Sequence, residues 1–220
     1  MITTEEEWNR AFELTLPLVS AGIGVLAITI MAFRSQLARR VLYEDGQYFV
    51  SVRFPGQHHE LRDFVQPDNP DILAVYSQKG PDPWALYNFV CQEISYRHDV
   101  GEFWQTPSET LARGYGDCED TSVLLTSLIR AGGTPNCYVV LGSLRGYGHA
   151  WCQLNGQILE TTYVQAMPAP DPEDYCPYVL FSDQEVIELW HGALEEVFNI
   201  RRNEALKLKL IAEVINHGTL

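Results

Sequence analysis

A cysteine lies among three carboxylates in the stretch RGYGDCEDTS, residues 113–122. Asp117 stands where a helix N-cap belongs, and Asp120, three residues later, stands in the position that a capping box uses. Cys118 is then expected to be the first residue of a helix. At that position unpaired N–H groups and the positive end of the helix dipole lower the pKa of a thiol. The stretch therefore predicts a nucleophilic thiolate.

A histidine and a carboxylate stand close together in HAWCQLNGQILETT, residues 149–162. Asn155-Gly156 is the preferred pair for a type I′ hairpin turn, and this turn makes Glu160 a diagonal cross-strand neighbour of His149. Such neighbours lie about 7–8 Å apart at the backbone, within reach of a long side chain. Taken alone, a strand histidine is more often a core residue than a base. Together, Cys118, His149 and Glu160 predict the nucleophile, base and orienting acid of a thiol acyl-transfer site.

The elements that must position these residues are a helix followed by a sheet. Helices are expected over 82–99, with Pro83 in the first turn, and over about 118–131. Three short strands follow them, NCYVVLG, GHAWCQL and QILETTY, because they are rich in β-branched and aromatic residues. The sequence thus predicts an α+β fold in which the helix of the nucleophile packs on a small antiparallel sheet.

The flanking regions are predicted from composition and periodicity. QYFVSVRF (47–54) is expected to form a strand, QPDNPD (66–71) a loop in a linker region, and the apolar stripes over 183–199 and 203–216 two C-terminal helices. The resulting division is an N-terminal apolar helix at 1–40, a strand and linker region at 41–79, a catalytic core at 80–182 and C-terminal helices at 183–220.

Composition excludes several classes of function. The 220 residues include 15 basic and 29 acidic side chains, a net charge of −14 that argues against nucleic acid as a partner. The five cysteines are an odd number without close pairing, which argues against a disulfide framework and favours a reducing compartment or one special thiol. No spacing typical of a zinc site or a dinucleotide-binding turn is present.

An uncharged apolar run of 20 residues extends from Leu14 to Phe33 and is long enough to span a bilayer as a helix. Arg34, Arg39 and Arg40 follow it, whereas only Arg10 precedes it, so the positive-inside bias predicts a membrane anchor with the catalytic domain in the cytoplasm. The alternative interpretation is a helix buried in a soluble protein or in a larger assembly, since Pro17 and several small residues make the run only moderately apolar.

The run FWQTPSETLARGYGDCEDTSVLLTSLIRAGG (103–133), followed by GHAW and LETT, resembles the transglutaminase-like cysteine peptidase superfamily. Its motifs are most similar to those of the bacterial transglutaminase-like cysteine proteinases, and the resemblance covers roughly residues 80 to 165. It implies a papain-like α+β core, a Cys118–His149 pair and a protein or peptide substrate. Two features depart from the family pattern. Glu160 stands where the family usually has Asp, and members of the similar proteinase group are typically exported.

The resemblance also implies two further sites. In the similar proteinase group the acids beside the nucleophile are associated with calcium, and Asp117 and Glu119 match those positions; carboxylate oxygens suit this hard cation. The alternative is that Asp117 caps the helix while Glu119 and Asp120 point to solvent or to a nearby cation. Gln105 is a candidate for an oxyanion hole together with the Cys118 N–H, or else a turn residue. No cofactor is required for this chemistry.

The leading functional hypothesis is a thiol-dependent hydrolase of amides or peptides that acts through a Cys-His-Glu triad and a thioester intermediate. A second hypothesis transfers the same thioester to an amine, as a transglutaminase does. A third, of a different class, is a binding or assembly module that keeps the fold without turnover.

Overall fold

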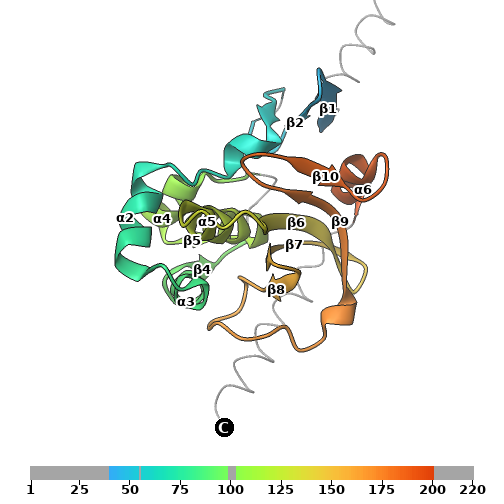
Figure 1. Cartoon of the computed structure of the whole chain (residues 1–220). Coiled ribbons are helices and arrows are strands. Elements are labelled where there is room, and N and C mark those ends of the chain that lie inside the picture. Colours follow the sequence, from blue (N-terminus) through green and yellow to red (C-terminus); the bar gives the residue numbers. More distant parts are fainter. Residues whose placement is uncertain (1–39, 55, 99–102, 201–220) are drawn as a thin grey trace, which may run out of the picture. The chain divides into compact units, whose positions relative to one another are not determined.

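The computed structural model describes residues 40–54, 56–98 and 103–200 (Figure 1). The apolar run predicted to form a membrane helix, 14–33, and the helix predicted at 203–216 lie outside the described residues. Within the described part of the chain, no helix is both long enough and apolar enough to cross a bilayer. The membrane anchor therefore stays a prediction from the sequence.

The main sheet contains five antiparallel strands in the order β10-β9-β6-β7-β8 (Figure 1). Its strands are β6 (Cys137–Leu144), β7 (Tyr147–Leu154), β8 (Gln157–Leu159), β9 (Tyr175–Phe181) and β10 (Val186–Glu188). Gly142 of β6 lies opposite His149 of β7. A Cβ atom on Gly142 would lie 2.2 Å from the carbonyl oxygen of Cys176 on β9, so only glycine lets these strands approach so closely.

The hairpin of β7 and β8 has the register that the sequence predicts. Leu154 pairs with Gln157, and Cys152 pairs with Leu159. Asn155 and Gly156 both have positive φ angles, 50° and 84°, as a type I′ turn requires. The ladder ends at Leu159, so Glu160 directly follows the last paired residue and its side chain is positioned by the hairpin.

Helix α5 (Cys118–Ala131) packs against β6 and β7 and is buried along almost its whole length (Figure 1). Three helices surround it: α2 (Pro70–Lys79), α3 (Pro83–Glu93) and α4 (Pro107–Arg113). Each of the three begins with proline after an N-cap side chain that accepts a hydrogen bond from the first turn. The predicted helices over 82–99 and 118–131 are thus confirmed, although α3 ends at Glu93.

The region 41–79 contains the expected strand, but the part expected to be a linker belongs to the folded core. It contains β1 (Val41–Glu44), β2 (Gln47–Val50), β3 (His59–Glu60) and the 3₁₀ helix η1 (Leu61–Phe64), followed by α2. Ile72 of α2 is fully buried in one apolar cluster with Leu124 and Leu128 of α5. The Pro- and Asp-rich stretch was expected to be a loop throughout. Its Asn69 and Pro70 are instead the N-cap and the first residue of α2.

The helix predicted over 183–199 is wrong in its first half. Val186–Glu188 form strand β10, which pairs with β9, and helix α6 extends only from Ala193 to Asn199. Gly192 precedes α6 with a φ of 83°, a conformation that separates the two elements. Ala193 and Leu194 are fully buried, so α6 packs firmly on the sheet beside β9 and β6.

The remaining elements are short. Two-residue strands β4 (Ser95–Tyr96) and β5 (Tyr115–Gly116) pair in parallel, and η2 (Pro172–Asp174) precedes β9. Strand β5 ends directly before Asp117. The β4–β5 pairing therefore fixes the path by which the chain enters α5.

Candidate active site

Cys118 is the first residue of α5, as the sequence predicts, and Asp117 is the N-cap. The Asp120 carboxylate accepts a hydrogen bond of 3.2 Å from the Asp117 N–H, which forms one half of the predicted capping box. A Cβ atom on Gly116 would lie 2.6 Å from the Cβ of Asp120, so glycine is needed at this approach. The thiol thus lies at the positive end of a 14-residue helix.

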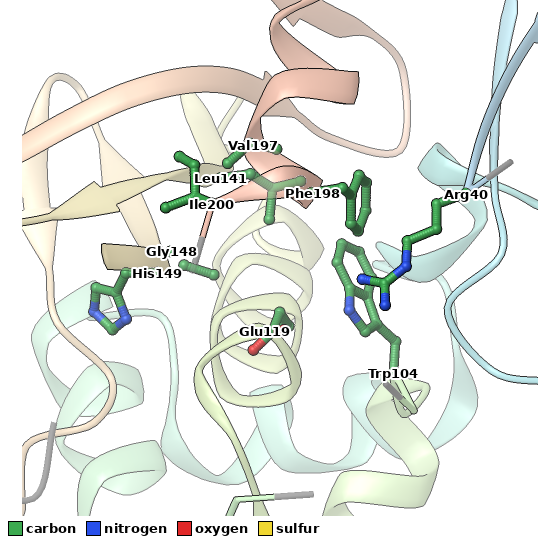
Figure 2. A pocket seen from close by; sticks show the side chains of 10 residues that line it. Arg40, Trp104, Glu119, Leu141, Gly148, His149, Val197, Phe198 and Ile200 are labelled. Carbon is green, nitrogen blue, oxygen red and sulfur yellow. The ribbon is translucent and has the colours of Figure 1, made fainter. Parts of the chain in front are cut away.

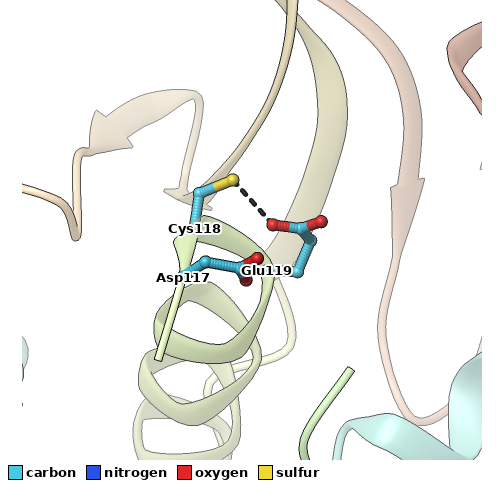
Figure 3. Close-up of side chains that lie close together, drawn as sticks. All are labelled: Asp117, Cys118 and Glu119. Carbon is cyan, nitrogen blue, oxygen red and sulfur yellow. Dashed lines mark hydrogen bonds between the residues drawn. The ribbon is translucent and has the colours of Figure 1, made fainter. Parts of the chain in front are cut away.

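The thiol of Cys118 donates a hydrogen bond to Oε2 of Glu119 at 2.7 Å (Figure 3). Both residues are buried, as is Asp117. Asp120 is buried as well, so the alternative in which Glu119 and Asp120 point to solvent is wrong, and their approach to a cation stays a prediction. Burial, followed by the charges of Glu119 and Cys118, raises the pKa of Asp117 well above its usual range. Acidic groups are thus crowded beside the candidate nucleophile, and this crowding favours the protonated form of Asp117.

His149 and Glu160 form a buried pair. Nε2 of His149 lies 2.7 Å from Oε2 of Glu160, and the two side chains are only 2% and 1% exposed. An ionised carboxylate can only accept hydrogen bonds, so Nε2 carries a proton in this pair. Nδ1 of His149 is buried and has no hydrogen-bond partner within the described residues. In the neutral imidazole, this leaves Nδ1 as the basic nitrogen.

Glu160 accepts further hydrogen bonds from residues that sequence reasoning missed. The N–H and hydroxyl of Thr162 donate to Oε1 at 2.9 and 2.6 Å, and the Tyr175 hydroxyl donates to Oε2 at 2.9 Å. Burial acts to raise the pKa of Glu160, but the charge of His149 and hydrogen bonds from His149 and Thr162 lower it to about 2. Glu160 is thus held as a carboxylate.

A small cavity lies between Glu119, on the helix that begins with Cys118, and His149, on the sheet (Figure 2). Glu119 and His149 line it together with Trp104 and with Val197 and Phe198 of α6. Its volume is about 30 Å³, room for about one or two water molecules. Cys118 itself is only 1% exposed. Residues of α6 thus form part of the wall of the cavity beside His149.

Gln105 is fully buried and bound to α5 through Asp120. Its backbone N–H donates to Oδ1 of Asp120 at 2.7 Å, and its Nε2 donates to Oδ2 at 2.6 Å. One N–H of the Gln105 amide is thereby used, which leaves the second as the donor available for an oxyanion. The oxyanion role of Gln105 stays a prediction.

All five cysteines are free thiols. Cys91, Cys137 and Cys152 are buried, and the sulfur atoms of Cys137 and Cys152 lie 3.6 Å apart across β6 and β7. Cys176, in contrast, lies exposed on β9.

A family model described as transglutaminase-like superfamily matches residues 77–159. The match contains Cys118 and His149 and ends one residue before Glu160. A search of curated proteins found no match. Residues 77–159, which carry Cys118 and His149, are thus similar to the transglutaminase-like superfamily.

A comparison with solved structures gave matches with TM-scores below 0.5. LapG of Legionella pneumophila in its calcium-bound form is 16% identical, with a TM-score of 0.43, over 61% of this chain and 98% of that one. The EGTA-treated form of LapG matches at 16% identity and a TM-score of 0.43, over 68% and 97%. A candidate cysteine protease from Cytophaga hutchinsonii matches at 15% identity and 0.43, over 57% and 48%.

Proposed function

We propose that the protein is a thiol-dependent hydrolase of peptides or amides that uses Cys118, His149 and Glu160. The observation that carries this proposal is the hydrogen bond between Nε2 of His149 and Glu160, which leaves Nδ1 of His149 as the basic nitrogen. The helix that begins with Cys118 packs against the strand of His149. A thiol at a helix N-terminus, a base and a carboxylate that orients the base are the parts that thiol acyl transfer requires.

In the proposed reaction, Nδ1 of His149 takes the proton of the Cys118 thiol. The thiolate attacks the carbonyl carbon of the substrate, and the resulting oxyanion accepts hydrogen bonds from the Cys118 N–H and from the Gln105 amide. When the C–N bond breaks, the imidazolium gives its proton to the leaving amine. Water, deprotonated by His149, then attacks the thioester and releases the acid and the free thiol.

Incubation with a library of proteome-derived peptides tests the proposal. New peptide N-termini, detected by mass spectrometry, are expected from the wild-type protein and not from Cys118→Ala or His149→Ala. Cys176→Ser is the matched control, because it removes the exposed thiol and leaves the site intact. Equal cleavage by wild type and Cys118→Ala would show that the activity does not belong to this site.

Two other functions are distinguished in the same assay. Transfer to an amine predicts that a fluorescent primary amine becomes attached to the acyl fragments and competes with hydrolysis. A binding or assembly module predicts neither product, although the fold is intact.

The cluster beside Cys118 suits a cation in part. One ligand atom each of Asp117, Cys118 and Glu119 lie within 4.8 Å of one another, all buried. The two carboxylates fit calcium, whereas a thiol does not, and calcium takes six to eight oxygen ligands. LapG, whose structure is described in calcium-bound and EGTA-treated forms, has a similar fold. We propose that Asp117 and Glu119 hold a calcium ion, which supplies positive charge against the crowded carboxylates.

Thermal unfolding tests the calcium site. Calcium chloride is expected to raise the unfolding midpoint of the wild type more than magnesium chloride does, and EGTA is expected to reverse the effect. Asp117→Asn and Glu119→Gln should lose most of the response, while Asp174→Asn, on the distant η2, should keep it. A calcium response that survives in both cluster variants would exclude this site.

The membrane anchor is tested separately. Full-length protein is expected in the membrane fraction and protein without residues 1–40 in the soluble fraction. Full-length protein in the soluble fraction would contradict the anchor and favour the alternative, a helix packed in the protein or in an assembly.

A further inference from the structure

Tyr175 reaches the candidate triad from a strand that sequence reasoning did not connect with it. Its hydroxyl donates a hydrogen bond of 2.9 Å to Oε2 of Glu160, and the residue is only 8% exposed. Tyr175 begins β9, which is separated from the strand of His149 by β6. The contact therefore joins Glu160 to the opposite part of the sheet.

The side-chain carboxylate of Glu160 accepts four hydrogen bonds, two on each of its oxygens. Oε1 accepts from the N–H and the hydroxyl of Thr162, and Oε2 accepts from Nε2 of His149 and the hydroxyl of Tyr175. A carboxylate has about four lone-pair sites, so its accepting capacity is filled. Thr162 fixes only the oxygen that faces away from the imidazole. Apart from His149 itself, Tyr175 is the donor that fixes the oxygen on which the imidazole depends.

The ring of Tyr175 also packs near the imidazole of His149. Its centroid lies 6.1 Å from that of His149 and 5.2 Å from that of Trp151, whose own ring lies 6.1 Å from His149. The three rings form one group around the pair. Glutamate has one more rotatable bond than the aspartate usual in this position, so a longer side chain must be held to keep the same contact with the imidazole.

We propose that Tyr175 is a positioning residue, which holds Oε2 of Glu160 against Nε2 of His149 and thereby keeps Nδ1 available as the base. This inference rests on the proposed function. Tyr175 is also a member of an apolar cluster with Val140, Leu144 and Trp151, so a purely structural role is the competing explanation. The two explanations differ in what removal of the hydroxyl alone does.

The test compares Tyr175→Phe with Tyr163→Phe. The Tyr163 hydroxyl is also buried and forms a 3.5 Å hydrogen bond with that of Tyr175, but it makes none with the Glu160 carboxylate. The readout is the rate at which iodoacetamide labels Cys118, followed by mass spectrometry across a range of pH in a Cys176→Ser background. Tyr175→Phe is expected to lower this rate about tenfold, the cost of one charge-assisted hydrogen bond. The midpoint of the labelling rate plotted against pH should also shift by about half a pH unit, because the carboxylate that faces His149 loses a hydrogen-bond donor.

Tyr163→Phe is expected to leave both the rate and the profile unchanged. Equal rates and equal profiles for the two variants, with only a lower unfolding midpoint for Tyr175→Phe, would overturn the positioning role. If Tyr175→Phe does not fold, a fluorinated tyrosine at position 175 changes the acidity of the hydroxyl without removing it, and an unmoved profile then overturns the proposal. Failure of the proposed function is recognised separately, because Cys118 in the parent protein would then react no faster than Cys91, Cys137 and Cys152.

Discussion

The two halves of the candidate site differ in how completely they are organised. On the sheet side, Glu160 and His149 form a buried pair in which each carboxylate oxygen has two donors. On the helix side, the thiol of Cys118 donates to Glu119, a buried carboxylate whose charge opposes formation of a thiolate. The proposed base is thus held by hydrogen bonds, while the proposed nucleophile lies against a negative charge. Removal of the negative charge should therefore lower activity at Glu160 but raise the reactivity of Cys118 at Glu119.

The largest effect is expected from Glu160→Gln. The new amide can donate to Nε2 of His149, which moves the imidazole proton to Nδ1 and removes the base. Peptide cleavage should fall on the order of 100-fold or more. Product formation with a fixed peptide substrate measures this, and Glu185→Gln, an exposed carboxylate bonded to Tyr138, is the control that should change nothing. An active Glu160→Gln would mean that the sheet side does not depend on its carboxylate.

The second effect concerns stability against pH. The pKa of Glu160 is about 2 in the folded protein and about 4.3 in an unfolded chain, so ionised Glu160 stabilises the fold above the higher value. This stabilisation is lost as pH falls through the folded value. Between pH 6 and pH 3 the loss from this residue is about 2 kcal/mol. Urea unfolding at the two pH values should show a smaller decrease for Glu160→Gln than for the wild type. Equal decreases would argue against a depressed pKa for Glu160.

On the helix side, Glu119→Gln is expected to act in the opposite direction. The substitution keeps the shape of the side chain but removes the charge that opposes a Cys118 thiolate. Labelling of Cys118 by iodoacetamide at neutral pH should become about tenfold faster, since about 1.4 kcal/mol of repulsion corresponds to that factor. Cys176→Ser is the background, because Cys176 is the exposed thiol. A slower reaction would show that Glu119 assists the nucleophile.

The smallest effect is expected from Phe198→Ala. Phe198 of α6 lines the cavity in front of His149 and contacts Trp104, with 6.0 Å between the ring centroids. Truncation should widen this cavity and speed labelling of Cys118 severalfold. The pH profile of labelling should not change, in contrast to the sheet-side variants. Leu73→Ala, an exposed leucine of α2, is the control. An unchanged rate would show that α6 does not limit access.

Local sequence rules predicted the backbone of the site. The N-cap at Asp117 and the turn at Asn155-Gly156 are encoded within a few residues, so they correctly placed Cys118 at a helix start and brought Glu160 within reach of His149. The resemblance to the superfamily supplied the rest of the core.

Contacts between distant residues could not be predicted in this way. Tyr175 is 15 residues from Glu160 and meets it only because β9 joins the sheet beside β6. The thiol bond to Glu119 depends on burial, which the acidic character of the stretch argued against. Over 183–199, one apolar stripe concealed a strand and a short helix, since Ile187 and Leu194 belong to different elements.

The cavity beside His149 bears on which acceptor can receive an acyl group. With a volume of about 30 Å³ it has room for about one or two water molecules. Val197 and Phe198 of α6 line this cavity, so the position of α6 would affect which acceptor reaches the proposed thioester. The ratio of hydrolysis to transfer would then depend on the position of α6 as well as on the chemistry of the proposed triad.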